Sequence, residues 1–238
     1  MAADAAPRVN KTIRVDIWSD IACPWCFIGK RRFEEGVRRF AASHPEVSIE
    51  SEYHSFELAP DTPEGFAGSE IDFLVRHKGM PRERVEQMLD QVTQLAAAEG
   101  LDYRFDRVQH VNTLRAHRLL HLAKARGVQA AAVERLLAAY FEEGRNLADD
   151  DELVALGGEV GLPEAEVRAA LTDPAVADAV KQDTVRAQML GITGVPFYLL
   201  QSTYGVSGAQ EPDSFVSVFE QVLERESATP APAPEETA

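Results

Sequence analysis

Cysteine and tryptophan are the rarest residue types in this sequence of 238 residues, with two of each. The cysteines, Cys23 and Cys26, are three positions apart, so a disulfide between them would close almost no loop and restrict the unfolded chain little. Zinc requires four ligands, and there is no second C-x-x-C and no suitably spaced Cys/His pair. The pair therefore points to redox chemistry, with two buried, inert cysteines as the alternative.

Basic residues are also few, with 24 Lys and Arg against 39 Asp and Glu and a formal net charge of −15. Nucleic acids and anionic membrane surfaces are bound by basic surfaces, so the sequence predicts neither as a partner. It has no apolar run of the length, about eighteen residues, that spans a membrane. Its first residues, MAADAAPRVNKT, lack the basic flank and apolar segment of a secretory signal, and we therefore expect a cytoplasmic location.

The start of the chain has the pattern of a strand, a helix and a second strand. Residues 13–18 (IRVDIW) alternate apolar and polar side chains, and residues 47–58 form a second, similar stretch. Between them lies an apolar stripe at helical spacing, made of Phe27, Ile28, Phe33, Val37 and Phe40. Because the crossover in such a unit is right-handed, we expect the two strands to be parallel.

Helix formers dominate residues 69–171, where β-branched runs disappear. Asn112 and Asp149 are expected to be N-caps. Glycine breaks divide the stretch into predicted helices at 69–78, 82–99, 113–126, 130–143, 150–159 and 164–171. A further helix should end at Gly191, followed by two short strands within residues 192–208 and a last amphipathic helix at 212–225.

The cysteine pair falls where the first strand leads into the first helix. Thiol–disulfide exchange needs one thiolate that attacks and a second thiol that resolves the mixed disulfide. Free N–H groups and the helix dipole favour a thiolate at a helix start, so Cys23 is the expected nucleophile. Cys26, one turn further and more buried, should stay protonated. Pro24 suits the first helical position, and Trp25 is expected to be an exposed apolar contact for substrate.

The segment Gly194-Val195-Pro196-Phe197 is unusual because a proline stands at the mouth of a predicted strand. Such a proline either marks an edge strand or lies in a cis bond that shapes a site. With WSDIACPWCFIGKRRFE, NTLRAHRLLHLAK and GITGVPFYLL, the chain resembles the DsbA family, and within it the FrnE-like branch of dithiol–disulfide isomerases. The likeness covers nearly all of the chain except the termini.

The resemblance implies an α/β fold of the thioredoxin-like type with an inserted all-α-helical domain. The thioredoxin-like domain would be discontinuous, at residues 12–62 and 176–226, and the insertion would be residues 63–175. Residues 1–11 and 227–238 would be disordered termini, the latter ending in an Ala/Pro/Glu-rich tail that cannot bury enough apolar surface to order itself.

The resemblance also assigns residues to the site. Pro196 would match the family's cis-proline, and the backbone of Val195 would pair with an extended substrate. A trans proline at a sheet edge is the alternative for Pro196. The residues Asn112, Thr113, Arg115 and His117 would lie near the active-site face, although an N-cap and a solvated helix face would explain them equally well.

Asp16, on the first predicted strand, has two interpretations. It could relay the proton of Cys26, as buried acids do in thioredoxin-like proteins. Alternation favours an ordinary role, because Asp16 shares a strand face with Arg14 and Trp18. We predict no metal site: His117 and His121 share a helix face, but HRLLH lacks the glutamate of a zinc-protease helix.

The predicted function is that of a thiol–disulfide oxidoreductase or isomerase acting on protein or small-molecule disulfides. The family's periplasmic oxidase has His inside the motif where this chain has Trp25, which argues against strong oxidase activity. A glutathione-dependent transferase or isomerase, of the kappa-class or hydroxychromene-carboxylate isomerase type, is the alternative on this fold, and a peptide-binding chaperone is a third hypothesis. We expect no metal or organic cofactor. Glutathione or a reductase would supply electrons, and the oligomeric state, a homodimer included, stays open.

Overall fold

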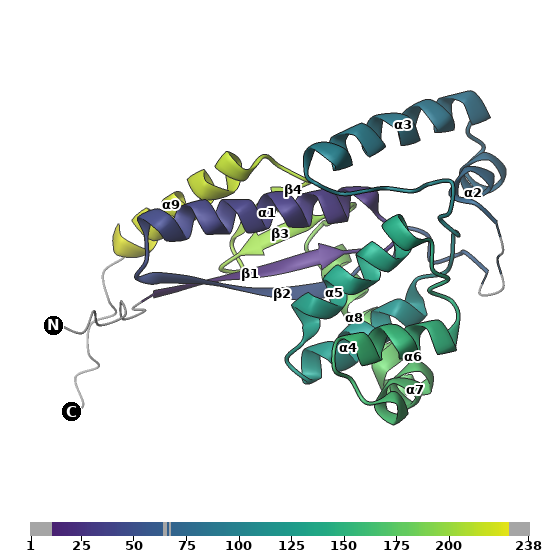
Figure 1. Cartoon of the computed structure of the whole chain (residues 1–238). Helices are drawn as coiled ribbons and strands as arrows, with labels where there is room; N and C mark the ends of the chain where they lie inside the picture. The colour runs from purple at the N-terminus through teal and green to yellow at the C-terminus, as the bar shows by residue number, and fades with distance from the viewer. Residues whose placement is uncertain (1–10, 64–65, 67, 229–238) are drawn as a thin grey trace, which may run out of the picture.

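A four-stranded mixed sheet forms the centre of the protein (Figure 1). The structure is a computed structural model, which describes residues 11–63, 66 and 68–228. The parallel strands β1 and β2 confirm the predicted strand–helix–strand unit, and β3 and β4 are antiparallel to their neighbours. The order across the sheet is β2-β1-β3-β4, with β1 (Lys11–Ser19), β2 (Val47–Ser55), β3 (Phe197–Leu200) and β4 (Tyr204–Ser207).

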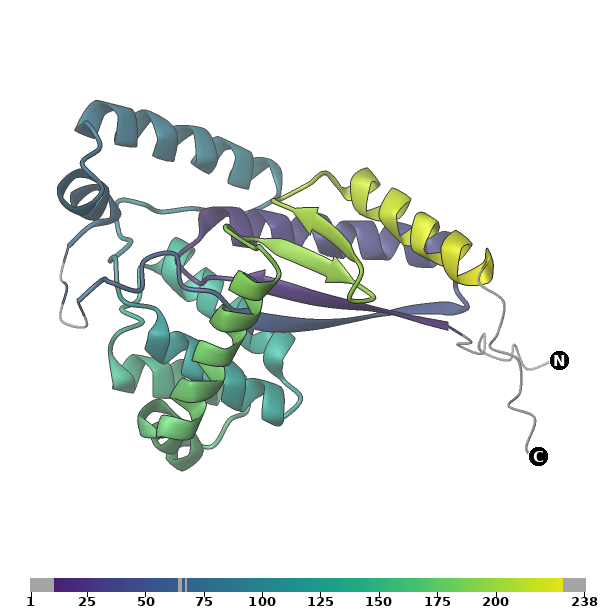
Figure 2. The same ribbon diagram turned by 180° about the vertical axis from the view of Figure 1, so that it is seen from behind.

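Two helices, α1 (Pro24–Ser43) and α9 (Pro212–Ala228), lie side by side on one face of this sheet (Figures 1 and 2). Phe33 stacks on Tyr198 of β3 at 5.3 Å between ring centroids and meets Phe215 of α9 edge-on at 5.4 Å. The stripe of α1 packs on the alternating apolar residues of β1 in a shared core that includes Ile13, Val15, Ile17, Phe27, Ile28 and Phe40. This packing fixes the N-terminus of α1 at the end of the sheet where β1 finishes.

The remaining helices before α8 gather beyond that end of the sheet (Figures 1 and 2). They are α2 (Glu70–His77), α3 (Arg82–Ala98), α4 (Leu114–Ala125), α5 (Gln129–Ala138), the π-helical turn η1 (Ala139–Glu143), α6 (Asp150–Glu159) and α7 (Glu164–Thr172). Each of the six helices predicted between residues 69 and 171 is present, the fourth of them ending in the π-helical turn.

The two predicted N-caps have different outcomes. Asp149 caps α6, because its carboxylate accepts the N–H groups of Asp151 and Glu152. Asn112 is not the N-cap of α4, which begins after Thr113. The Asn112 side chain turns back on the chain instead, and its amide oxygen accepts the N–H of Leu114 at 3.0 Å.

Helix α8 (Pro174–Met189) packs against β2 on the other face of the sheet and against α4. Trp18 is buried on this face beside Ala187, Ile192 and Leu199. The predicted boundary between residues 175 and 176 falls inside α8 and needs correction. The helix begins at Pro174 because Asp173 caps it, accepting the N–H of Ala175. The rest of the predicted division into two domains stays a prediction.

The predicted disordered termini also need two corrections. Strand β1 begins at Lys11, which pairs with Val47 of β2, and α9 continues to Ala228 through ERESA, a run that contains good helix formers. The other residues of the two predicted termini, 1–10 and 229–238, lie outside the described residues. In the part of the chain that the structure describes, no helix combines the length and the apolar character needed to cross a lipid bilayer.

Candidate active site

Cys23 lies at the start of α1, where the chain leaves β1. It is the N-cap residue, with an extended backbone, and Pro24 is the first residue of the helix. The Cys23 N–H donates to the carbonyl oxygen of Asp20 at 3.2 Å. The sulfur caps none of the helix N–H groups, in contrast to our expectation. The thiol instead donates to the carbonyl oxygen of Val195 at 3.5 Å.

Cys26 lies one turn inside α1. Both cysteines are free thiols, and each is 3% exposed. We had expected Cys26 to be the more buried of the two, and this prediction was wrong. They differ in access, because Cys23 lines a pocket and Cys26 does not. Burial raises the pKa of the Cys26 thiol well above its ordinary value, and its hydrogen bond and charge interaction with Cys23 act in the same direction. Cys26 is therefore a neutral thiol near pH 7.

The loop before β3 lies against Cys23. The Val195–Pro196 peptide bond is cis, and Pro196 is buried while Val195 is partly exposed. The carbonyl oxygen of Pro196 accepts the N–H of Gly208 at 2.8 Å, which ties this loop to the segment after β4. On the other side it packs on α1 at Gly29, where an added Cβ would lie 2.8 Å from Pro196 Cγ. The start of α1 and the loops flanking the β3–β4 hairpin thus meet at the cysteines.

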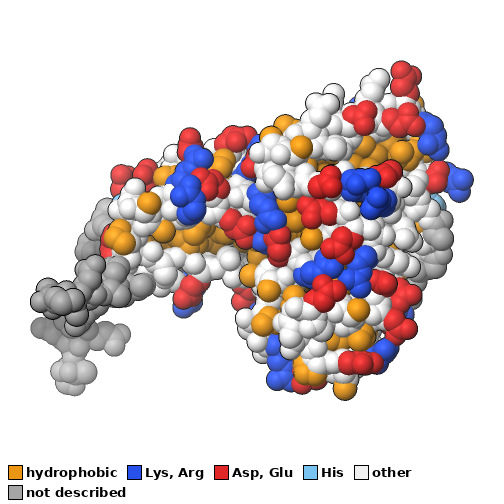
Figure 3. All heavy atoms as spheres, viewed as in Figure 1, with side chains coloured by type: hydrophobic (Ala, Val, Ile, Leu, Met, Phe, Trp, Pro, Cys, Tyr) orange, Lys and Arg blue, Asp and Glu red, His pale blue; other side chains and the backbone are white. Residues whose placement is uncertain are grey.

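A pocket of about 420 Å³ opens beside Cys23, Pro24 and Trp25. Trp25 is 42% exposed, the exposed apolar surface that we expected at this position. Helices α2 and α3 contribute apolar side chains to the pocket wall, namely Phe73, Leu74, Met88, Leu89, Val92 and Leu95. Figure 3 shows apolar side chains reaching the surface beside α3, among acidic and basic ones.

A buried aspartate–histidine pair beside Cys23 was missed by sequence reasoning. Asp20 and His117 are each no more than 1% exposed, and His117 Nε2 lies 3.3 Å from Asp20 Oδ1. The carboxylate also accepts the N–H groups of Leu58 at 2.8 Å and Ala22 at 3.3 Å. Burial opposes the charge on Asp20, but the hydrogen bonds outweigh it, so the pKa of Asp20 lies below its ordinary value. Burial also opposes the charge on His117, but its hydrogen bond with Asp20 and the charges of Asp20, Glu57 and Asp183 together outweigh burial and raise the pKa of His117.

Asp16 does not lie beside Cys26. Strand alternation turns Asp16 away from the α1 face, towards α8, where its carboxylate contacts His54 Nε2 at 2.6 Å and Arg186 at 3.1 Å. The groups that act on the Cys26 thiol are Cys23, the Ser19 side chain and the backbone of Asp20. The proton-relay interpretation of Asp16 is therefore corrected in favour of the ordinary one.

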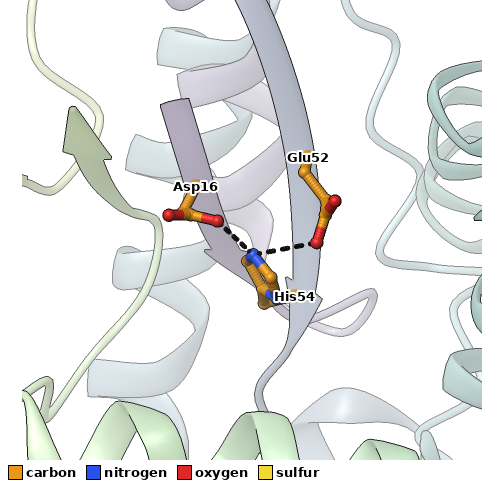
Figure 4. Close-up of side chains that lie close together, drawn as sticks. All are labelled: Asp16, Glu52 and His54. Atoms are coloured by element: carbon orange, nitrogen blue, oxygen red, sulfur yellow. Dashed lines mark hydrogen bonds and ion pairs between the residues drawn. The ribbon is translucent and has the colours of Figure 1, made fainter. Parts of the chain in front are cut away.

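Asp16, Glu52 and His54 form a cluster on that face (Figure 4). Asp16 and Glu52 are partners in the register of β1 and β2, and one ligand atom from each of the three side chains lies within 4.8 Å of the others. Arg186 and Lys124 already bind the two carboxylates, at 3.1 and 2.5 Å. We therefore assign the cluster to an ion-pair network that holds β1, β2, α4 and α8 together.

The residues that the resemblance placed near the site divide into two groups. Thr113 lines the pocket and hydrogen-bonds to Asp20, and His117 forms the buried pair. Arg115 instead binds Asp150 at the start of α6. Asn112 donates to the carbonyl oxygen of Thr62 at 2.8 Å. Two of the four thus act at the cysteine site, and two fasten the surrounding loops.

Known proteins resemble this chain over most of its length. The family model for the DSBA-like thioredoxin domain matches residues 14–220. The uncharacterized protein YwbO of Bacillus subtilis is 29% identical over 219 residues, which are 90% of this chain and 98% of YwbO.

Solved structures give the same picture. A probable DsbA oxidoreductase of Streptomyces coelicolor is 40% identical, with a TM-score of 0.85 and 95% of each chain covered. The cytosolic disulfide reductase DsbM of Pseudomonas aeruginosa, in a structure with GSH, is 20% identical, with a TM-score of 0.63 and coverage of 89% of this chain and 99% of DsbM. A 2-hydroxychromene-2-carboxylate isomerase is 15% identical, with a TM-score of 0.66 and coverage of 92% and 100%. At these two lower identities the likeness concerns the fold alone.

Proposed function

The chain belongs to the DSBA-like thioredoxin domain family, and we propose that it is a thiol–disulfide oxidoreductase whose redox centre is the dithiol Cys23–Cys26. The observation that carries the proposal is the unequal access of two adjacent thiols. Cys23 lines the pocket at the N-terminus of α1, while Cys26 has no access to the pocket and a raised pKa. One thiol available for attack and one held protonated are the two parts that the exchange reaction needs.

The proposed reaction has two steps. The Cys23 thiolate attacks one sulfur of a substrate disulfide, the substrate S–S bond breaks, and the leaving sulfur takes a proton from solvent. Cys26 then attacks the Cys23 sulfur, and its proton goes to the second departing substrate sulfur. The substrate gains two electrons and two protons, and the enzyme retains a Cys23–Cys26 disulfide.

The substrate would approach between the pocket and the loop before β3. The carbonyl oxygen of Val195 lies 3.5 Å from the Cys23 sulfur, so a backbone N–H beside the substrate cysteine could replace the Cys23 thiol as its donor. Trp25 would contact the substrate on the pocket side, where it is exposed. This arrangement suits a disulfide in an extended peptide or in a small molecule.

Two molecules of a small monothiol such as glutathione, which leave as their disulfide, or a reductase protein would return the enzyme disulfide to the dithiol. The proposal includes no metal or organic cofactor, because the two sulfurs carry both electrons. A cytoplasmic location stays a prediction. Cell fractionation tests this location, and acid quenching followed by alkylation reports the redox state of Cys23 and Cys26 in each fraction.

The test of the proposal is turnover in insulin reduction with dithiothreitol as the electron donor. Cys23→Ser should abolish turnover, and Cys26→Ala should accumulate a mixed disulfide between Cys23 and the substrate, visible as an added mass. Thr203→Ser, a change at an exposed turn between β3 and β4, is the control and should match the native rate. Unchanged turnover in Cys23→Ser would contradict the proposal.

The apolar pocket beside Cys23 favours a second candidate, a glutathione-dependent transferase or isomerase acting on small aromatic compounds. That chemistry needs one activated sulfur and no resolving thiol. It therefore predicts saturable glutathione binding and an activity towards aromatic electrophiles that survives Cys26→Ala, whereas exchange chemistry predicts that Cys26→Ala stops multiple turnover.

A further inference from the structure

The Asp20–His117 pair connects the redox motif to helix α4. Asp20 holds the loop before Cys23 through its backbone, since its carbonyl oxygen accepts the Cys23 N–H at 3.2 Å. Its carboxylate holds the same loop through the Ala22 N–H at 3.3 Å and reaches His117 on α4 at 3.3 Å. Asp20 and Cys23 also line the same pocket. A buried carboxylate thus lies within the turn that carries the nucleophile.

Acidic groups surround His117. The groups that act on His117 are Asp20 from the loop after β1, Glu57 from the segment after β2 and Asp183 from α8, all of them acidic. Burial raises the pKa of Glu57, which reduces its share of negative charge. His117 Nδ1 has no hydrogen-bond partner within the described residues, so the polar contact of the ring is with Asp20. With its pKa raised by these acidic groups, the imidazole is the group placed to offset the charge of the Asp20 carboxylate.

We propose that His117 is a positioning residue for thiol–disulfide exchange, because its cationic ring neutralises the buried Asp20 carboxylate and so keeps the Cys23 thiolate accessible near neutral pH. An unneutralised carboxylate in the turn before Cys23 would disfavour a second negative charge on the sulfur. The inference rests on the proposed function in taking Cys23 as the nucleophile. It makes α4, a helix of the predicted insertion, act on the nucleophile through Asp20.

The experiment measures alkylation of Cys23 by iodoacetamide in the reduced full-length chain, followed by mass spectrometry between pH 5 and 9. His117→Gln keeps a donor for Asp20 but removes the positive charge, and we expect alkylation at pH 7 to slow at least about threefold, with the pH profile displaced to higher pH. The double variant Asp20→Asn/His117→Gln removes both charges, and we expect it to recover at least half of the lost rate. His121→Gln, one turn along α4, is the matched control and should alkylate at the native rate.

The double variant separates the charge effect from a purely structural one. If the pair only packs the loop, losing both partners would slow alkylation as much as losing one, and that result would overturn the proposal. A native rate and pH profile in His117→Gln would overturn it as well. Thermal unfolding of every variant checks that each is folded when its rate is measured.

A second measurement uses the native protein and therefore holds even if His117→Gln does not fold. In the reduced chain with ¹⁵N-labelled histidine, NMR should show both ring nitrogens of His117 protonated at pH 7. A neutral His117 ring at that pH would overturn the proposal. Alkylation reports Cys23 alone and needs no turnover, so a failure here differs from a failure of the proposed function, which would appear as turnover in Cys23→Ser.

Discussion

The hydroxyl of Tyr103 donates a hydrogen bond to the carbonyl oxygen of Pro24 across 2.6 Å. Tyr103 belongs to the segment between α3 and α4, and its buried ring stacks on Phe141 at 4.7 Å and on Phe27 of α1 at 6.2 Å. The helical part of the chain therefore touches the redox motif at its second residue. The redox motif and the segment between α3 and α4 thus pack together.

Replacing Tyr103 with Phe should lower the free energy of unfolding by about 1 kcal/mol, the usual net value of one hydrogen bond. The ring and its stacking partners are kept, so packing should not change. Urea unfolding measures the difference, and Tyr204→Phe, at a half-buried position of β4, is the control. A loss above about 3 kcal/mol would show that the ring had moved and that more than this hydrogen bond was lost.

Gly29 is required where α1 passes the loop before β3. A Cβ at this position would lie 2.7 Å from the Tyr198 hydroxyl oxygen and 2.8 Å from Pro196 Cγ, closer than real Cβ atoms come. Gly29→Ala should therefore push the loop away from Cys23, cost about 1 to 3 kcal/mol of stability and reduce insulin reduction.

The matched control for that substitution is Gly158→Ala. Gly158 is in α6, and an added Cβ there would meet nothing within 4 Å. Alanine has the higher helix propensity, so this variant should be up to about 1 kcal/mol more stable than the native chain, with native activity. Equal effects of the two substitutions in thermal unfolding would contradict the close approach at Gly29.

Local pattern was enough to predict the strand–helix–strand start and the helices between residues 69 and 171, and the family resemblance supplied the thioredoxin-like α/β class. The Asp20–His117 pair could not be predicted in this way, because its members are 97 positions apart and meet only when α4 docks on the loop before Cys23. The sequence held two signals of this pair: an acidic residue shortly before the cysteine motif, and a histidine in a stretch that the family resemblance placed near the site. Neither signal indicates a partner until both are placed in space.

The role of Asp16 shows a second limit of prediction from sequence. Alternation fixes which strand face a side chain takes but not what covers that face. Helix α8 comes from the other end of the chain and supplies Arg186 and Asp183 opposite β1 and β2. The boundary error at residue 175 has the same origin, because α8 belongs by packing to both the sheet and α4.

Asp183 should make stability depend on pH. Burial raises the pKa of Asp183, but hydrogen bonds with His121, His54 and the Ser55 N–H outweigh it, so the folded-state pKa lies well below the ordinary Asp value. A depressed pKa contributes stability above the unfolded-state value, near 3.9, and this stability is lost as pH falls through the folded-state value.

Asp183→Asn should therefore be less stable than the native chain at pH 6 by about 1 to 2 kcal/mol, a value discounted for partial exposure. The difference should shrink as pH falls below about 4, because the unfolded chain then takes up a proton at Asp183 while the folded chain still holds the carboxylate ionised. Urea unfolding at pH 6, 4 and 3 measures it, with the exposed Asp61→Asn as the control. A difference that stays constant down to pH 3 would rule out this linkage.

Trp25 should set the redox poise of the cysteine pair. It stands between the two cysteines, is exposed at the pocket and carries no charge. A histidine in its place would be cationic below its ordinary pKa of about 6.5 and would stabilise the Cys23 thiolate, and with it the reduced form. We expect Trp25→His to raise the reduction potential by at least about 30 mV, which corresponds to about 1.4 kcal/mol for two electrons.

Equilibration with glutathione buffers at pH 6 and 8 measures the reduction potential of the variant, and the rise should be larger at pH 6. Trp25→Gln is the neutral control, and an equal rise in both variants would mean that loss of the indole, and not the added charge, shifts the equilibrium.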